Sequence, residues 1–127
     1  MQKNIIKTEH APAAIGPYSQ AVSAGGFLFV SGQIPINPQT GQVVTTGIED
    51  ETAQVIKNIS AILEAAGANL SHVVKATIFI KSMDDFAKIN AVYAAHFTGN
   101  FPARETVEVS RLPKDVNIEI SVIAQLP

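Results

Sequence analysis

The chain has 127 residues, of which 46% are hydrophobic and 16% charged, with a formal net charge of −2 and no cysteine. This composition favours one folded domain over residues 1–127, with apolar surface left for contacts between subunits, and it makes nucleic acid an unlikely partner. The lack of cysteine excludes disulfides and Cys-ligated metals, and no long apolar run predicts a signal peptide or a membrane span, so we expect a cytoplasmic protein.

The first part of the sequence predicts a strand, a loop and a hairpin. Residues 4–8 form a short strand candidate. Residues 11–20, "APAAIGPYSQ", contain two prolines and a glycine and should form a loop. Residues 21–35 predict two strands joined at Gly25-Gly26, because paired glycines favour a tight hairpin turn.

A helix should follow the turn-rich residues 36–47. Thr46 and Glu49 match a capping box, which predicts a helix N-terminus there. Apolar residues then recur at helical spacing, and Gly67 is a suitable C-terminal stop. The apolar positions of this helix are Val55, Ile56, Ile59, Ile62, Leu63 and Ala66.

The second half predicts a strand, a helix and two further strands. β-branched residues dominate 72–80, "HVVKATIFI", as expected of an inner strand. Ser82 and Asp85 form a second capping pattern before a helix. The apolar stripe of that helix consists of Phe86, Ile89, Tyr93 and Phe97. Residues 103–109 and 116–125 alternate between apolar and polar side chains, which predicts two strands.

This order of elements predicts an α+β fold with a mixed six-stranded sheet. Because each helix leads from one strand to another, both helices should cover the same face of the sheet. The opposite face would then mix polar and apolar side chains: Arg104, Thr106, Glu119 and Ser121 beside Phe27, Phe29, Phe79 and Ile123. Such a face is too apolar for water and too polar for a core, so we expect other subunits to cover it and to leave polar pockets.

Arg104 and Glu119 are the main candidates for a functional pair. The planar guanidinium of an arginine donates two parallel hydrogen bonds to a carboxylate, and a glutamate can position water or move a proton. Arg104 could instead form a surface ion pair with Glu105 or Glu108. Glu119 could equally pair with a lysine such as Lys75.

Other residues indicate a pocket without specifying its chemistry. Asn90 lies on the apolar side of the second helix, so its amide should fix a loop or line a pocket. Tyr18, in the proline-containing loop, is more simply interpreted as a cover over the core. The histidines lack metal-ligand spacing and no glycine pattern fits a nucleotide, so we expect no metal and no cofactor. The residues favour a small anionic ligand and leave the reaction open.

The segments "APAAIGPYSQA", "SGQIPINPQTG" and "PAR…VEVSRLPKD…IEI" follow one another along almost the whole chain. In order and spacing they resemble the RidA/YjgF family of reactive-intermediate deaminases. The resemblance implies a chorismate-mutase-like fold and a homotrimer that binds a small carboxylate substrate in clefts between subunits. It also implies hydrolysis of 2-enamine and 2-imine acids, such as 2-aminoacrylate from pyridoxal-phosphate enzymes, to 2-keto acids and ammonia without a cofactor.

The resemblance also implies roles for the candidate residues. Arg104 would bind the substrate carboxylate with the backbone N–H of Gly32, and Glu119 would position the attacking water. Thr106 stands where many members of the family have a cysteine. A catalytic role through the backbone of Thr106 would survive this replacement, whereas a regulatory role of the thiol would be lost.

The remaining pocket residues implied by the resemblance are Tyr18, Ser31 and Asn90. Two functions of other classes stay open at this point. A ligand-sensing trimer would use the same pocket without turnover. An RNA-cleaving translation inhibitor is the other alternative, and the acidic balance of the chain counts against it.

Overall fold

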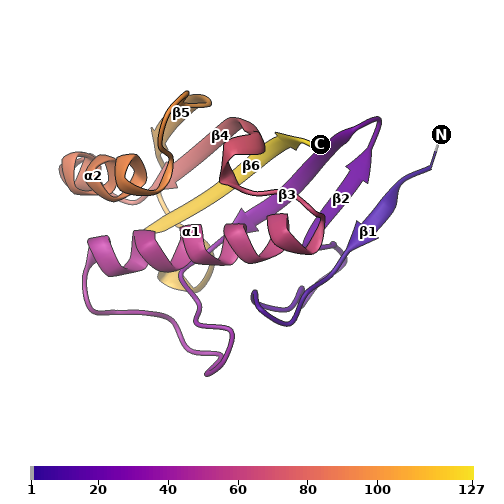
Figure 1. The fold of residues 1–127 in the computed structure, drawn as a ribbon. Helices are drawn as coiled ribbons and strands as arrows, with labels where there is room; N and C mark the ends of the chain where they lie inside the picture. The colour runs from indigo at the N-terminus through magenta and orange to yellow at the C-terminus, as the bar shows by residue number, and fades with distance from the viewer. Residues whose placement is uncertain (1) are drawn as a thin grey trace.

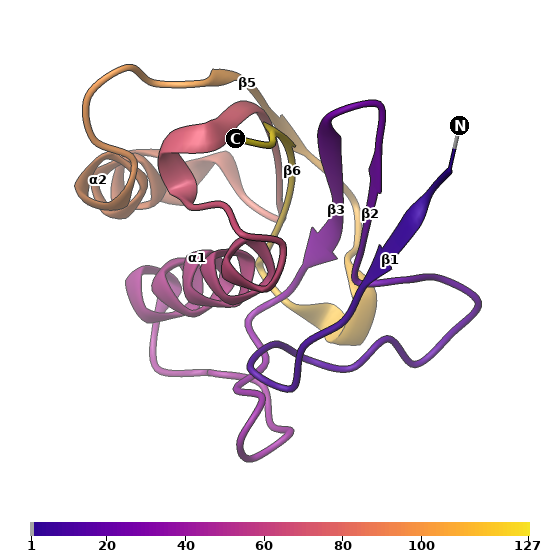
Figure 2. The same ribbon diagram turned by 45° about the vertical axis from the view of Figure 1, so that its right-hand side comes forward.

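The computed structural model describes residues 2–127, which form one six-stranded sheet with both helices on one of its faces (Figures 1 and 2). The predicted α+β architecture is therefore confirmed. The strands lie in the order β1-β2-β3-β6-β4-β5, with β4 and β5 parallel and all other neighbours antiparallel. The elements are β1 (Asn4–Ile6), β2 (Ala21–Ala24), β3 (Phe27–Gln33), α1 (Ile48–Ala65), β4 (Val73–Ile80), α2 (Phe86–His96), β5 (Ala103–Glu108) and β6 (Ile118–Gln125).

A two-residue turn joins β2 to β3, as the paired glycines predict. Gly25 and Gly26 have φ angles of 59° and 85°, both in the left-handed region that glycine adopts without steric cost. Two such residues in succession give the turn whose twist matches that of an antiparallel hairpin. The turn therefore sets the register of the hairpin, in which Ala24 pairs with Phe27.

The hydrophobic core lies between the helices and the sheet. Its fully buried side chains include Val55, Ile56, Ile59, Ile62 and Leu63 from α1 and Leu28, Ile78, Ile118 and Ile120 from the strands. Each such side chain stabilises the fold by about 1.5–3 kcal/mol, so this layer fixes the strands on which the candidate residues stand. α2 lies beside α1, next to β5 (Figure 1). Within residues 2–127, no helix is long and apolar enough to cross a membrane.

The N-termini of both helices differ from the predicted caps. α1 begins at Ile48 after Gly47, whose φ of 130° suits only glycine, and Thr46 makes no capping bond. The Thr46 hydroxyl instead donates to the Asp50 carboxylate at 2.7 Å, so the predicted capping box is wrong. Ser82 does accept a hydrogen bond from a following backbone N–H, but it caps the short 3₁₀ turn that precedes α2.

The register of the edge strand β5 corrects the predicted faces. Arg104 lies opposite Ala76 and Thr106 opposite Ile78, and both partners in β4 are buried beneath the helices. Since paired residues of neighbouring strands point to the same side, Arg104 and Thr106 belong to the helix side of the sheet and not to the open side. Val107 faces the open side and is 42% exposed. An edge strand is only partly covered on either side. The alternation of apolar and polar side chains along β5 therefore does not identify its buried face.

The open face otherwise has the predicted composition. In β6 the half-buried Glu119, Ser121 and Ile123 alternate with residues buried under the helices. Phe29 pairs with Ile123 on this side and is 47% exposed. No helix covers this face of the sheet in residues 2–127 (Figure 2). Phe27, Phe29 and Val107 thus expose apolar area on an uncovered face that also carries Glu119 and Ser121.

Candidate functional site

Arg104 stands at the edge of the sheet, between β5 and α2. Its Nη1 donates to Oδ1 of Asn90 at 2.8 Å. Its guanidinium carbon lies 5.0 Å from the centre of the Tyr93 ring and 5.8 Å from that of Phe86, both within the range of cation–π attraction. Within residues 2–127, Arg104 forms no ion pair. Uncharged groups therefore hold the guanidinium, and its charge remains available for an anion.

The acidic residues that could have neutralised Arg104 are engaged elsewhere. Glu105 lies 3.1 Å from the Lys75 ammonium on the open face. Glu108 accepts a hydrogen bond from the backbone N–H of Met83 at 2.8 Å. The interpretation of Arg104 as part of an ordinary surface ion pair is therefore excluded for this chain.

A pocket of about 290 Å³ opens beside Arg104. It is lined by Asn90, Tyr93, Ala94, Phe101, Pro102 and Arg104. Its size lies at the lower end of the range for small-molecule sites, about 300–1,000 Å³. Burial raises the pKa of the Tyr93 phenol, and nearby Arg104 opposes part of this shift. The phenol is therefore neutral near pH 7 and does not compete for the charge of Arg104.

Thr106 lies two positions beyond Arg104 on the same side of β5. Its Oγ1 is buried and has no hydrogen-bond partner within residues 2–127. A buried hydroxyl without a partner costs about 1–3 kcal/mol, and this is unusual in a native core. The arrangement is compatible with Thr106 acting in an assembled site, but its side chain makes no polar contact with Arg104 or Asn90 in one chain.

Glu119 lies on the opposite side of the sheet, against the backbone of Gly32. Between Val30 and Gln33 the pairing of β3 with β6 shifts, which leaves a bulge at residues 31–32. A Cβ atom at Gly32 would collide with Oε2 of Glu119 and lie 2.8 Å from its Cδ, so only glycine leaves room for the carboxylate. Partial burial raises the pKa of Glu119, because the ionised form loses hydration.

Ser31 ties the bulge to the loop that carries Tyr18. The Ser31 hydroxyl donates to the carbonyl oxygen of Ser19 at 2.6 Å. The backbone N–H of Ser31 donates to the carbonyl oxygen of Gln20 at 2.9 Å. The Tyr18 ring is 53% exposed. The interpretation of Tyr18 as a cover over the core is therefore wrong, and the ring is free to meet another molecule.

The candidate residues thus form two groups on opposite faces of the sheet. Asn90, Arg104 and Thr106 belong to the helix side, whereas Gly32 and Glu119 belong to the open side. The prediction that Arg104 and Glu119 share one face is wrong, and one chain cannot direct both at the same small molecule. A site that uses both side chains on one small molecule would therefore need two copies of the chain.

Sequence reasoning missed the two aromatic rings that hold Arg104. Phe86 and Tyr93 were interpreted only as packing residues of the helix stripe. Asn90 lies between them at helical spacing, so positions 86, 90 and 93 form one face of α2. A polar residue within an apolar stripe was the available signal, and it marks the point where this stripe faces Arg104 and not the core.

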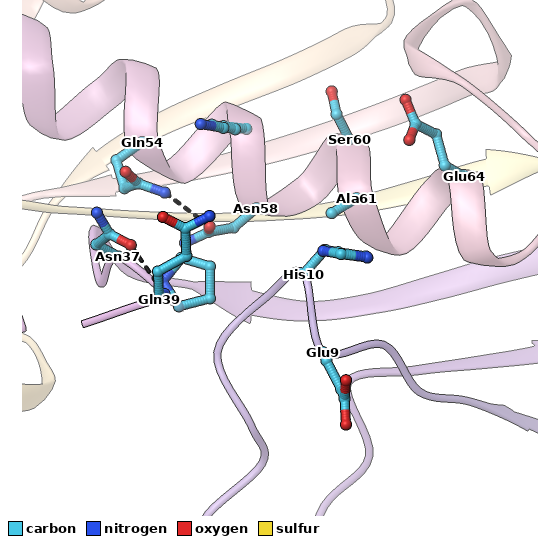
Figure 3. Close-up of a pocket in the computed structure, with 11 residues that line it drawn as sticks. Glu9, His10, Asn37, Gln39, Gln54, Asn58, Ser60, Ala61 and Glu64 are labelled. Atoms are coloured by element: carbon cyan, nitrogen blue, oxygen red, sulfur yellow. Dashed lines mark hydrogen bonds between the residues drawn. The ribbon is translucent and has the colours of Figure 1, made fainter. Parts of the chain in front are cut away.

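A separate pocket of about 310 Å³ lies between α1 and two loops, away from both groups (Figure 3). Its amides bond to one another and to the backbone. Gln54 donates to Asn58 at 2.9 Å, and Asn58 donates to the carbonyl oxygen of Ile36 at 2.9 Å. These amides therefore stabilise the loops. Among residues 2–127, no group of three or more His, Asp or Glu side chains could hold a metal ion.

Gly32→Ala should move the Glu119 carboxylate into water without unfolding the protein. Gly32 has no left-handed φ angle, so alanine fits the backbone, and the colliding group is the end of a flexible side chain. We expect the pKa of Glu119 to fall toward its ordinary value, measured by carbon-13 NMR titration of the carboxyl group. The wild-type protein, titrated under the same conditions, serves as the reference. An unaltered Glu119 titration would show that Gly32 does not hold the carboxylate.

The fold and the candidate residues define a class of small α+β proteins in which an arginine and a glutamate lie on opposite faces of one sheet. The chain belongs to the RidA/YjgF family, since the profile of this family, described as endoribonuclease L-PSP, matches residues 8–126. The resemblance stated from the sequence is therefore confirmed.

Individual relatives are similar over nearly their full length. The chain is 61% identical over 122 residues to a RutC family protein of Pyrococcus horikoshii, which covers 96% of this chain and 97% of that protein. It is 52% identical over 122 residues, 94% of each chain, to the Escherichia coli protein named 2-iminobutanoate/2-iminopropanoate deaminase. The solved structure of YyfA, a Rid family protein of Yersinia pestis, has a TM-score of 0.97 at 52% identity and covers 98% of this chain and 100% of that chain.

Proposed function

We propose that this protein hydrolyses reactive 2-enamine and 2-imine acids, such as 2-aminoacrylate, to 2-keto acids and ammonia. The observation that carries the proposal is the guanidinium of Arg104, which is fixed beside a small pocket without an acidic partner. Such a group suits a substrate carboxylate. The deaminase name of the E. coli relative at 52% identity supports the reaction. By this activity the protein would remove intermediates released by pyridoxal-phosphate enzymes.

The proposed active site lies between two subunits of a homotrimer. One subunit contributes Arg104 and Asn90, and its neighbour contributes Glu119 and the backbone N–H of Gly32. The opposite-face placement of Arg104 and Glu119 supports this division. Association would also cover the apolar open face, which includes Phe27, Phe29, Phe79 and Ile123. The proposed number of three subunits is the one that the resemblance to the family implies.

In the proposed mechanism Arg104 binds the substrate carboxylate through the N–H groups that Asn90 leaves free. The enamine tautomerises to the imine, whose carbon is electrophilic. Glu119 accepts a proton from water as the new C–O bond forms and passes it to the former imine nitrogen, which gives a carbinolamine. It then moves the hydroxyl proton to the same nitrogen as the C=O bond forms and the C–N bond breaks. Ammonia leaves, and the 2-keto acid remains. The imine is reactive by itself, so positioning and modest acid–base help suffice.

A coupled assay tests the reaction. 2-Aminoacrylate is generated freshly by a dehydratase, and the appearance of the 2-keto acid is followed with and without this protein. Acceleration supports the deaminase. Binding of a 2-keto acid without acceleration would instead favour a ligand-sensing trimer.

Mixed assemblies test whether the site is shared. Arg104→Ala and Glu119→Gln subunits should each be nearly inactive alone, because each lacks one half of every site. Co-expressed with different affinity tags and purified through both tags, they should form mixed trimers in which about one interface in three combines an intact Arg104 with an intact Glu119. We expect purified mixed assemblies to recover a corresponding share of wild-type activity.

The control is a subunit that carries both substitutions, co-expressed with Arg104→Ala. These assemblies contain no intact arginine and should stay inactive. If the first mixture also stays inactive although light scattering shows mixed trimers, the division of the site between subunits is wrong. A stable monomer at micromolar concentration would also contradict it.

A further inference from the structure

Tyr93 has a contact with Arg104 that the mechanism above does not use. Its side chain is 4% exposed, yet it lines the pocket beside Arg104. One face of its ring stacks on Phe97, with 4.3 Å between the ring centres and 17° between the planes. The other face is therefore left for the guanidinium carbon of Arg104, 5.0 Å from the ring centre. The three groups form a stack that ends in the guanidinium.

The hydroxyl of Tyr93 does not explain why tyrosine stands here. Its oxygen is buried and has no hydrogen-bond partner within residues 2–127. A buried hydroxyl without a partner lowers stability. The contact with Arg104 is made by the ring face, 5.0 Å from the guanidinium carbon, and a phenylalanine would present the same face.

Arg104 needs such a support because of its position. It extends from an edge strand, and within residues 2–127 the only hydrogen bond of its side chain joins Nη1 to Asn90. A single bond leaves the plane of the guanidinium free to rotate about it. The ring faces of Tyr93 and Phe86 restrict that rotation, since a cation is attracted to the face of an aromatic ring and not to its edge.

We propose that Tyr93 is a positioning residue that fixes the plane of the Arg104 guanidinium through the face of its ring. Its value for function rests on the proposed binding of a substrate carboxylate by Arg104. A guanidinium that is already ordered loses less freedom when it binds, so the ring should improve affinity for the carboxylate and have little effect on the chemical step.

The first measurement needs no ligand. Nitrogen-15 NMR relaxation of the Arg104 Nε–H reports how strongly the guanidinium is ordered. Tyr93→Phe should retain this order, and Tyr93→Leu should lose it. Phenylalanine analogues with one, two or three ring fluorines at position 93 keep the shape of the ring but weaken its attraction for cations, so order should fall stepwise along this series.

The second measurement concerns binding. Titration calorimetry with 2-oxobutanoate as the probe gives Kd, and turnover of 2-aminoacrylate gives KM and kcat. We expect Tyr93→Leu to raise Kd and KM by about 3- to 10-fold, in keeping with a partly buried cation–π contact, while kcat changes by less than about twofold. In an Arg104→Ala background the same substitution should have no further effect on Kd, since the group it positions is gone.

Phe97→Leu is the matched control. Phe97 is as deeply buried as Tyr93 and stacks on it, but has no cation–π contact with Arg104. The Phe97→Leu substitution should lower thermal stability about as much as Tyr93→Leu and leave the order of the Arg104 guanidinium largely intact.

Two results would overturn the proposal. One is equal order of the Arg104 guanidinium across the fluorinated series. The other is a loss of guanidinium order in Tyr93→Phe that is as large as the loss in Tyr93→Leu. The second result would assign the role to the hydroxyl. The wild-type protein could fail to turn over 2-aminoacrylate while the order of Arg104 still falls along the fluorinated series. That result would refute the proposed deaminase activity but not the positioning role of Tyr93.

Discussion

Arg104→Ala should lower kcat/KM for 2-aminoacrylate by at least ~100-fold. Charge-assisted hydrogen bonds contribute about 1.5–3 kcal/mol each, so the loss of a bidentate pair corresponds to about 3 kcal/mol or more, or two decades at about 1.4 kcal/mol per decade. Arg104→Lys should recover little of this rate, because an ammonium keeps the charge but cannot present two parallel N–H groups. Steady-state kinetics of both variants, with assembly checked by light scattering, measures the effect.

Arg111→Ala is the matched control for the loss of one positive charge. Arg111 is exposed and bonds to Asp115 at 2.8 Å, a surface pair whose loss should affect stability little. Its removal should leave kcat/KM within about twofold if electrostatic attraction by net charge is a minor factor. Near-normal rates in Arg104→Ala would reduce this arginine to a residue of the sheet edge, and the proposed substrate contact would be wrong.

Glu119→Gln should lower kcat by about 10²- to 10⁴-fold, the usual contribution of a positioned acid or base. The amide keeps the size of the side chain and its place against Gly32 but cannot accept a proton from water. The variant should fold at least as stably as the wild type at pH 7. Burial raises the pKa of Glu119, so the ionised carboxylate carries a stability cost at neutral pH that disappears on acidification and that glutamine never has.

The pH dependence of the wild type provides a second measurement on the same residue. The proposed base works only when ionised, so kcat/KM should fall on acidification. Because the pKa of Glu119 is raised, the midpoint of this fall should lie above pH 4.5, the ordinary value for a glutamate. The residual rate of Glu119→Gln should lack this limb. A midpoint at or below pH 4.5, or a limb that persists in Glu119→Gln, would assign the titration to another group.

Local signals in the sequence sufficed for the order of the elements. The glycines at 25 and 26 identify the hairpin, and the dense β-branched run identifies β4 as a strand between two others. The hairpin depends on interactions between residues close in sequence, and the place of β4 inside the sheet depends on the burial of its side chains. The start of α1 was misplaced because Thr46 bonds to Asp50, whereas the chain turns at Gly47. The capping-box pattern does not show that the side chain of Thr46 bonds to Asp50 and not to the backbone.

The sequence allowed candidate residues to be selected one by one but did not reveal how they are arranged. Arg104 and Glu119 could be selected by their chemistry and by family resemblance. Their placement on opposite faces depends on the register of β5 against β4, a long-range pairing that alternation does not reveal. The room that Gly32 leaves for Glu119 depends on a bulge in β3, which is likewise a property of the paired strands.

The separation of Arg104 from Glu119 by the thickness of the sheet has a consequence for when the protein becomes active after synthesis. If the site is divided as proposed, a newly synthesised chain can complete its fold and still possess no catalytic centre, because the two halves of the centre belong to different molecules. Under the proposed mechanism, a folded protomer released from the ribosome does not hydrolyse imines until it associates with other copies of the chain. The cell would then set the onset of this chemistry through the concentration of the protein, without a separate regulator.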